Sequence, residues 1–197
     1  MNETIKYYQD YLNEFMNMTL YADMASVRDR FTQYLQLGDK ILDAGCGSGR
    51  DTLAFRQAGY EVVGIDACKE ICQRASAVTG QEVLCMTFQE LSYEKAFEGI
   101  WACASLLHVP SEEIEEVLMK LVKALKTQGV IYLSVKYGEF EGVRNGRYFT
   151  DYTEASLLAV LEKWQELQIA EIWQTDDTKV EKRDNWLNVI VRRKENE

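Results

Sequence analysis

Short apolar runs alternate with amphipathic, helix-like stretches along most of the chain. Five runs have the length and the β-branched or aromatic content of buried strands, and turn residues bound them. They are Lys40–Ala44, Glu61–Asp66, Glu82–Thr87, Gly99–Ala104 and Val130–Val135. Helical spacing of apolar residues follows the first, second and fourth of these runs. Strands that alternate with helices predict an α/β protein built on a doubly wound, mainly parallel sheet.

The two ends of the chain depart from this alternation. Asn2 to Leu35 carries aromatic and aliphatic residues at helical spacing, which predicts two helices, with Asp23 as N-cap of the second. After a further helix at 153–164, the apolar runs Ile169–Trp173 and Trp186–Val191 have no helix between them. Two such strands predict an antiparallel hairpin at the edge of the sheet.

A glycine-rich turn lies between the first predicted strand and its helix. Its spacing is Gly45-x-Gly47-x-Gly49, and Arg50 stands where a dinucleotide fingerprint would have its third glycine. Asp43 precedes the turn, and Asp66 ends the second strand, where a carboxylate can accept hydrogen bonds from both ribose hydroxyls. Arg50 suits a ligand carboxylate and Asp43 a ligand ammonium group. A ligand with a ribose, an amino group and a carboxylate is S-adenosylmethionine rather than NAD.

These residues resemble the class I S-adenosylmethionine-dependent methyltransferases. Asp43-Ala44-Gly45-Cys46-Gly47-Ser48-Gly49-Arg50-Asp51 is similar to the first motif of that family, and Val63-Gly64-Ile65-Asp66 to the second. The resemblance implies a Rossmann-like, seven-stranded, mostly parallel sheet with an antiparallel C-terminal hairpin, helices on both faces and an N-terminal helical lid. It implies one domain over 1–197, with the lid at 1–35 and the core at 36–197. The terminal hairpin distinguishes this family from plain dinucleotide-binding domains.

The resemblance also implies where the cofactor binds. The glycines would admit the methionine part, and the ribose would lie on Asp66. The family often has an acid beside the adenine just past the third strand, but this chain has Thr87-Phe88-Gln89 there, and Phe88 could stack on the base or fill the core. The expected cofactor-binding residues are Tyr8, Asp43, Gly45, Cys46, Gly47, Arg50, Asp66, Ala67, Thr87, Phe88, Ala104 and Ser105.

The acceptor is expected beyond the fourth strand, at the switch point of the sheet. His108, the sole histidine of the sequence, lies there and is a candidate general base or substrate contact; a structural role before the next helix is the alternative. The long connection from Lys136 to Tyr152 looks irregular, and it is a candidate substrate loop or a solvated loop anchored by its aromatics. Its expected substrate-binding residues are Arg144, Arg147 and Tyr148.

The aromatic stripe of the N-terminal helices also has two interpretations. Tyr7, Tyr8, Tyr11 and Phe15 could pack on the sheet or close over the cofactor as a lid that expels water.

The composition of the chain disfavours several classes of binding partner. The 197 residues carry 22 Lys and Arg against 32 Asp and Glu, a net charge of −10, which disfavours nucleic acid as the main ligand. No apolar run suggests a membrane span, and the amino-terminal residues lack the apolar core of a signal peptide. Five scattered cysteines and one histidine indicate reduced thiols in a cytoplasmic protein and no metal site.

The expected reaction is in-line transfer of the sulfonium methyl group to a small-molecule acceptor, leaving S-adenosylhomocysteine. The enzyme would accelerate the reaction mainly by aligning the acceptor with the methyl group and by excluding water. A base is needed only if the acceptor must lose a proton. The chain looks most like the small-molecule branch, including tellurite- and thiopurine-type enzymes. An NAD-dependent oxidoreductase, a protein or RNA methyltransferase, and a non-catalytic binding protein stay open as alternatives, and a monomer or homodimer is expected.

Overall fold

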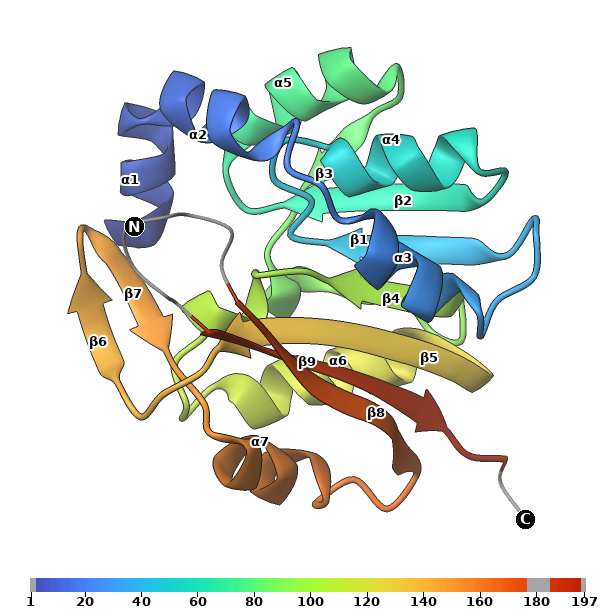
Figure 1. Cartoon of the computed structure of the whole chain (residues 1–197). Helices are drawn as coiled ribbons and strands as arrows, with labels where there is room; N and C mark the ends of the chain where they lie inside the picture. The colour runs from blue at the N-terminus through green and yellow to red at the C-terminus, as the bar shows by residue number, and fades with distance from the viewer. Residues whose placement is uncertain (1–2, 177–184, 196–197) are drawn as a thin grey trace.

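The computed structural model describes residues 3–176 and 185–195. A seven-stranded sheet with the order β3-β2-β1-β4-β5-β9-β8 forms its centre (Figure 1). The strands are β1 (Lys40–Ala44), β2 (Glu61–Asp66), β3 (Val83–Cys85), β4 (Phe97–Ala102), β5 (Leu125–Lys136), β8 (Leu167–Asp176) and β9 (Asn185–Arg193). Pairing is parallel from β3 to β5, whereas β9 is antiparallel to both β5 and β8. The predicted mostly parallel sheet with an antiparallel C-terminal hairpin is confirmed.

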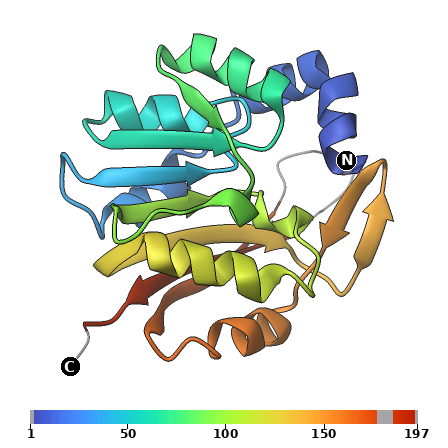
Figure 2. The same ribbon diagram turned by 180° about the vertical axis from the view of Figure 1, so that it is seen from behind.

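Helices cover both faces of the sheet (Figures 1 and 2). They are α1 (Glu3–Asp10), α2 (Leu12–Thr19), α3 (Ala25–Thr32), α4 (Arg50–Gln57), α5 (Lys69–Thr79), α6 (Ile114–Ala124) and α7 (Glu154–Leu161), with short 3-10 turns η1 (Phe88–Glu90) and η2 (Leu106–His108). On one face Phe31 of α3 and Phe55 of α4 pack against Trp101 of β4. On the other face the apolar sides of α6 and α7 close the larger core cluster.

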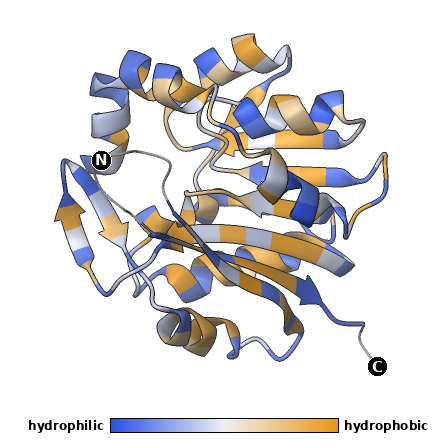
Figure 3. Cartoon of the chain, in the orientation of Figure 1, coloured by the Kyte–Doolittle hydropathy of each residue, from blue (hydrophilic) through white to orange (hydrophobic). Residues whose placement is uncertain are grey.

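The division into two faces follows from the period of the strands, in which successive side chains point to opposite sides. Ile41 of β1 lies in the cluster under α3 and α4, and its neighbour Leu42 lies in the cluster under α6 and α7. Hydrophobic residues accordingly gather along the strands, and hydrophilic ones colour much of the helices' surface (Figure 3). Burial of both faces explains why these strands read as nearly continuous apolar runs.

The N-terminal region contains three helices, so the prediction of two was wrong. The first expected helix is interrupted at Tyr11, whose φ of −112° and ψ of 27° lie outside helical values. Met24 is the N-cap of α3, and Asp23 lies one position before it, where its Oδ1 accepts the Ala25 N–H at 2.9 Å. Asp23 therefore supports the helix start, as its residue type suggested, without being the N-cap itself.

The connection after β5 is more regular than predicted. It contains a second, two-stranded antiparallel sheet of β6 (Glu141–Arg144) and β7 (Arg147–Thr150). Asn145 and Gly146 join the strands with φ values of 52° and 77°. Both residues in the left-handed region match the tight hairpin turn that Asn-Gly favours.

Strand boundaries also differ from the prediction, and β5, β8 and β9 all begin earlier and end later than predicted. β4 ends at Ala102, so Cys103 and Ala104 lie just past it, and β3 is confined to Val83–Cys85. The charged stretch 177–184 between β8 and β9, which shows no functional pattern in the sequence, lies outside the described residues.

Candidate functional site

The glycine turn after β1 is fixed by hydrogen bonds to the end of β2. The N–H groups of Gly45 and Cys46 both donate to the Ile65 carbonyl, at 3.0 and 2.8 Å. Gly45 has a φ of 81°, and a Cβ at this position would lie 2.5 Å from Cβ of Ser105. A side chain would therefore meet both backbone strain and a steric clash. The turn can approach the β4 end closely because residue 45 is glycine.

Asp66 is the acceptor at the centre of this turn. Its Oδ2 accepts the Gly47 N–H at 3.1 Å and its Oδ1 accepts the Cys68 N–H at 2.9 Å. Burial raises the pKa of Asp66 to about 6, although the hydrogen bonds from Cys68, Gly47 and Ala67 oppose the rise. No cation among residues 3–176 and 185–195 forms an ion pair with this carboxylate. Each oxygen keeps acceptor capacity for a hydroxyl.

Asp43 is the second carboxylate near the turn, and its side chain is buried. Its Oδ2 accepts the Thr52 hydroxyl at 2.6 Å. Burial raises its pKa to about 7, and the neighbouring charge of Asp51 adds to the rise. A carboxyl group in this setting gains most from an incoming cation, because a cation would offset both causes.

Arg50, which we expected to hold a ligand carboxylate, is engaged by the protein. Its Nη2 lies 2.6 Å from Oδ2 of Asp51, and its Nε lies 3.0 Å from Oδ1. Arg28 of α3 and the indole N–H of Trp101 also donate to Asp51, at 2.7 and 3.0 Å. Burial alone would raise the pKa of Asp51, but the guanidinium groups of Arg50 and Arg28 hold it below its ordinary value. Arg50 thus begins α4 in a buried network, and its proposed ligand contact stays a prediction.

The side chains of Cys46 and Thr87 are engaged within the protein and do not point to a ligand contact. Cys46 is buried in a cluster with Cys72, Ala75 and Val83, so its backbone is the part that borders the turn. Thr87 caps the short turn η1 through Glu90, whose Oε2 accepts both the hydroxyl and the N–H of Thr87.

Phe88 and Phe15 approach the glycine turn from two directions. The Phe88 ring lies 3.6 Å from where a Cβ of Gly45 would stand, and the Phe15 ring lies 3.0 Å from the corresponding position at Gly47. Phe15 also packs edge-on against Tyr8, with ring centroids 4.8 Å apart. The N-terminal helices therefore contribute aromatic rings to this end of the sheet.

Ala104 and Ser105 close the other side of the turn. The Ala104 N–H donates to Oγ of Ser134 at 2.9 Å, and the Ser105 hydroxyl donates to the Ala44 carbonyl at 2.6 Å. Ala104 has a φ of 51°, which is uncommon for a residue with a side chain and often marks functional backbone. Ser134 of β5 was not anticipated, because nothing in its apolar strand distinguishes it in the sequence.

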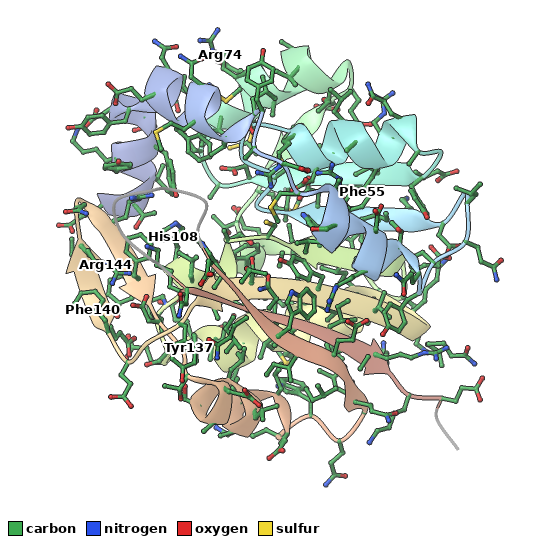
Figure 4. The ribbon with its side chains drawn as sticks, in the orientation of Figure 1. Phe55, Arg74, His108, Tyr137, Phe140 and Arg144 are labelled. Atoms are coloured by element: carbon green, nitrogen blue, oxygen red, sulfur yellow. The ribbon has the colours of Figure 1, made fainter. Side chains whose placement is uncertain are left out.

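His108 lies at the end of η2, between α1 and β7 (Figure 4). Its Nε2 is 2.9 Å from the Tyr8 hydroxyl and its Nδ1 is 2.6 Å from the Tyr148 carbonyl oxygen. Burial lowers the pKa of His108 to about 4, so the imidazole is neutral at physiological pH. The structure brings together Tyr8 and His108, which lie 100 positions apart in the sequence.

The two candidate arginines of the hairpin have different surroundings. Arg144 forms a two-fold hydrogen-bonded pair with Asp151, at 3.0 Å on each side, and stacks on Phe140 (Figure 4). Arg147 instead lies over the Tyr7 ring at 4.6 Å and near Phe149 at 5.1 Å. The Tyr148 hydroxyl donates to Glu141, so Tyr148 reaches His108 through its backbone.

Two classes of feature are absent from the part of the chain that the structure describes. Within residues 3–176 and 185–195, no group of three or more His, Cys, Asp or Glu side chains could hold a metal ion. Within the same ranges, no helix has the length and apolar character needed to cross a bilayer.

Comparison with known proteins agrees with this geometry. The family model described as a methyltransferase domain matches residues 41–129, from β1 into β5. The 1,6-didemethyltoxoflavin-N1-methyltransferase of Burkholderia thailandensis, solved with its substrate and S-adenosylhomocysteine, superposes with a TM-score of 0.77 at 20% identity, over 95% of this chain and 87% of that chain. The family match and the shared fold support the class I S-adenosylmethionine-dependent methyltransferases as the family that this chain resembles. The resemblance predicted from the sequence is confirmed.

Curated relatives match this chain over part of their own length. YqeM of Bacillus subtilis, known by name only as a methyltransferase, is 23% identical over 158 residues, which are 75% of this chain and 59% of YqeM. The ubiquinone biosynthesis O-methyltransferase of Rickettsia typhi is 27% identical over 100 residues, 48% of this chain and 40% of the relative. The chain thus spans less than two thirds of the length of these relatives.

The fold also occurs in a protein named for other chemistry. The [4+2]-cyclase SpnF superposes with a TM-score of 0.70 at 16% identity, over 87% of this chain and 81% of that chain. Identity at this level establishes the fold alone, and the reaction has to be argued from the site.

Proposed function

We propose that this protein transfers the methyl group of S-adenosylmethionine to a small-molecule acceptor. The observation that carries the proposal is the pair of carboxylates at the ends of β1 and β2, the buried Asp43 and the half-buried Asp66, beside the glycine turn. Neither carboxylate has an ion-pair partner within residues 3–176 and 185–195. Desolvated acids without a counter-charge are costly to the fold, and their raised pKa values are typical of groups that a ligand uses.

S-adenosylmethionine is the cofactor that fits these residues. Asp66 would accept hydrogen bonds from the ribose hydroxyls, and Asp43 would face the ammonium group. The family match and the relative solved with S-adenosylhomocysteine agree with the cofactor predicted from the sequence. When bound, this cofactor supplies a methyl group already activated by its sulfonium charge.

The chain's own residues would position the acceptor and exclude water. The rings of Tyr8 and Phe149 pack against His108. Phe15 packs on Tyr8, and the Arg147 guanidinium lies near the rings of both Tyr8 and Phe149. An aromatic enclosure of this kind favours a flat, small acceptor over a polymer. The names of two similar proteins, acting on toxoflavin precursors and in ubiquinone biosynthesis, support a small-molecule acceptor.

The remaining expectations accompany this proposal. We propose one domain over 1–197, in which residues 1–35 serve as lid and 36–197 as core, and cytoplasmic action without nucleic acid or metal. A monomer or homodimer remains the prediction for the assembly. A binding protein without transferase activity is the second candidate, because the fold alone does not establish the reaction.

Calorimetric titration tests the proposal first. S-adenosylmethionine, S-adenosylhomocysteine and NAD are titrated in parallel into the full chain. Binding of both sulfur ligands and no binding of NAD is expected, followed by methylation of at least one member of a small-molecule acceptor panel. Failure of both sulfur ligands to bind would refute the cofactor site, whereas tight binding without transfer to any acceptor would favour the binding protein.

A further inference from the structure

The hydrogen bonds of His108 define which of its nitrogens can accept a proton. A carbonyl oxygen only accepts, so the contact with the Tyr148 carbonyl at 2.6 Å places the hydrogen on Nδ1. In the neutral ring Nε2 then carries the lone pair, and the Tyr8 hydroxyl donates to it at 2.9 Å. The lone pair of Nε2 therefore receives a phenol hydroxyl in this structure.

A cation lies beside the same phenol. The Arg147 guanidinium is 5.8 Å from the Tyr8 ring centroid and 4.6 Å from that of Tyr7. Burial raises the pKa of the Tyr8 phenol, and both the charge and the hydrogen-bonding of Arg147 oppose that rise. Nε of Arg147 is buried without a hydrogen-bond partner, and no carboxylate within residues 3–176 and 185–195 pairs with the guanidinium.

These contacts suggest that the Tyr8 hydroxyl occupies, at Nε2 of His108, the position where a substrate hydroxyl would bind. A lone pair that receives a hydroxyl proton, an adjacent guanidinium that no carboxylate of the described residues neutralises, and surrounding aromatic rings are the groups that bind and ionise a phenol. Asp66 also lies close enough to raise the pKa of Tyr8, so this place borders the proposed cofactor site.

We propose that the methyl acceptor is an acidic ring hydroxyl, of the phenol or enol class, which displaces the Tyr8 hydroxyl from His108 and lies against Arg147. This inference rests on the proposed methyl transfer and names its substrate class. It makes the reaction an O-methylation.

The step balances without a further reactant. Nε2 of His108 takes the hydroxyl proton while the acceptor oxygen forms its bond to the methyl carbon. The methyl–sulfur bond breaks, its electron pair remains on sulfur, and the products are a methyl ether and S-adenosylhomocysteine. The proton then passes from Nε2 to solvent. Arg147 stabilises the negative charge that grows on the acceptor oxygen before the new bond is complete.

Other acceptor classes fit these residues less well. A protonated amine would meet the positive charge of Arg147, and a neutral amine would give that charge nothing to stabilise. Burial lowers the pKa of His108 to about 4, so its imidazole is a weak base. A weak base removes a proton readily only from an acidic hydroxyl. The site thus matches acidic hydroxyls in charge and in proton affinity.

The test uses three probes of nearly equal shape: 4-nitrophenol, 4-nitroaniline and 4-nitroanisole. Each is titrated into the full chain saturated with S-adenosylhomocysteine, at a pH where free 4-nitrophenol keeps its proton. The phenol is expected to bind at least roughly tenfold tighter than the other two, because it alone can both donate to Nε2 and carry negative charge toward Arg147. Equal binding of the three probes would overturn the inference.

Variants separate the contributions. His108→Asn keeps an N–H that can reach the Tyr148 carbonyl but removes Nε2, and it should abolish the preference for the phenol. Arg147→Gln should weaken phenol binding at least roughly tenfold. The matched control is Arg30→Gln, since Arg30 also stacks on an aromatic ring, that of Trp173, but lies on α3 against β8. Equal loss in Arg30→Gln and Arg147→Gln would contradict the role of Arg147.

Tyr8→Phe distinguishes displacement from participation. It removes the hydroxyl that competes for Nε2 and keeps the ring, so 4-nitrophenol should bind at least as tightly as to the unchanged protein. Loss of phenol binding in Tyr8→Phe would show that the acceptor needs the Tyr8 hydroxyl and would overturn the displacement.

A spectral measurement on the unchanged protein avoids any question of misfolding. The ionisation constant of bound 4-nitrophenol, read from its phenolate absorbance, should rise at least roughly tenfold over that of the free probe. An equal or smaller constant would refute the inference. Failure to bind S-adenosylhomocysteine would instead refute the proposed function, so the two failures are distinguishable.

Discussion

The N–H of Gly47 donates to Oδ2 of Asp66 at 3.1 Å and joins the glycine turn after β1 to the carboxyl end of β2. Two segments separated by 19 positions thereby form one rigid edge. A preformed edge of this kind lowers the entropy cost of ligand binding, because the backbone need not be ordered by the ligand.

Gly47→Val should weaken S-adenosylmethionine binding at least roughly tenfold while the protein stays folded. Gly47 has a φ of 53°, and an added Cβ would lie 3.0 Å from the Phe15 ring. Calorimetry measures the affinity and circular dichroism the fold. Gly38→Val is the matched control, because Gly38 has a φ of 90° with nothing within 4 Å and lies before β1, at its amino end. An unchanged affinity in Gly47→Val would remove the turn from the cofactor site.

Asp66→Ala should also weaken cofactor binding at least roughly tenfold, because the ribose would lose its charged acceptor. Asp66→Asn keeps the size of the side chain and one acceptor oxygen, so it separates the lost charge from the lost volume. Calorimetry with S-adenosylhomocysteine gives both affinities. Asp66 would have no role in binding if both variants matched the unchanged protein.

Cofactor affinity should rise with pH through about 6, the raised pKa of Asp66. Below that pH the carboxyl group holds a proton, whereas the ribose hydroxyls need an ionised acceptor, so binding releases a proton. Above it the carboxylate is already ionised and its contribution levels off. Titration in buffers of different ionisation enthalpy counts the protons released, and a step that persists in Asp66→Asn would have another origin.

The free energy of unfolding should fall as pH rises toward about 7 because of Asp43. Its pKa is raised from 3.8 by burial, so the folded state keeps a proton that the unfolded chain has already lost in that window. The stabilisation from protonated Asp43 is present at low pH and lost as pH passes its folded pKa. Urea denaturation across the window should give a smaller slope for Asp43→Asn, and an identical slope would assign the effect elsewhere.

Asp51→Asn should destabilise the protein by about 3 kcal/mol, because it leaves two largely desolvated guanidinium groups without their buried charge partner. Arg28 and Arg50 both pair with Asp51, whose side chain is 6% exposed. Asp10→Asn removes the solvent-exposed pair with Lys6 and should change the free energy of unfolding by less than about 1 kcal/mol. Similar losses in both variants, measured by urea denaturation, would contradict the structural role of Asp51.

The elements that could be predicted from the sequence are those with local signals. Gly45, Gly47 and Asp66 belong to one strand–turn–helix–strand unit, whose periodicity places them together. The hairpin of β6 and β7 also had a local signal, Asn145-Gly146, but its strands are too short and too polar to show a clear alternation.

The partners of the site residues could not be predicted in the same way. Arg50 looked available in the sequence, and its engagement depends on Asp51 being fixed from outside the helix by Arg28 and Trp101. The pairing of Tyr8 with His108 depends on α1 crossing to β7, which no periodicity encodes. Contacts between distant segments are set by packing, and one sequence carries little direct record of them.

One contact of α1 bears on the order in which the site is assembled during synthesis. The Tyr148 N–H donates to Oγ1 of Thr4 at 2.9 Å, so the first helix is held by a strand that the ribosome makes 144 positions later. The glycine turn, Asp43 and Asp66 can form while β7 is still in the ribosome, because their contacts are local in sequence. A nascent chain therefore has an interval in which its nucleotide edge is complete and its first helix is not yet docked on β7. During that interval the edge that carries Asp66 lacks the helix that β7 later holds in place.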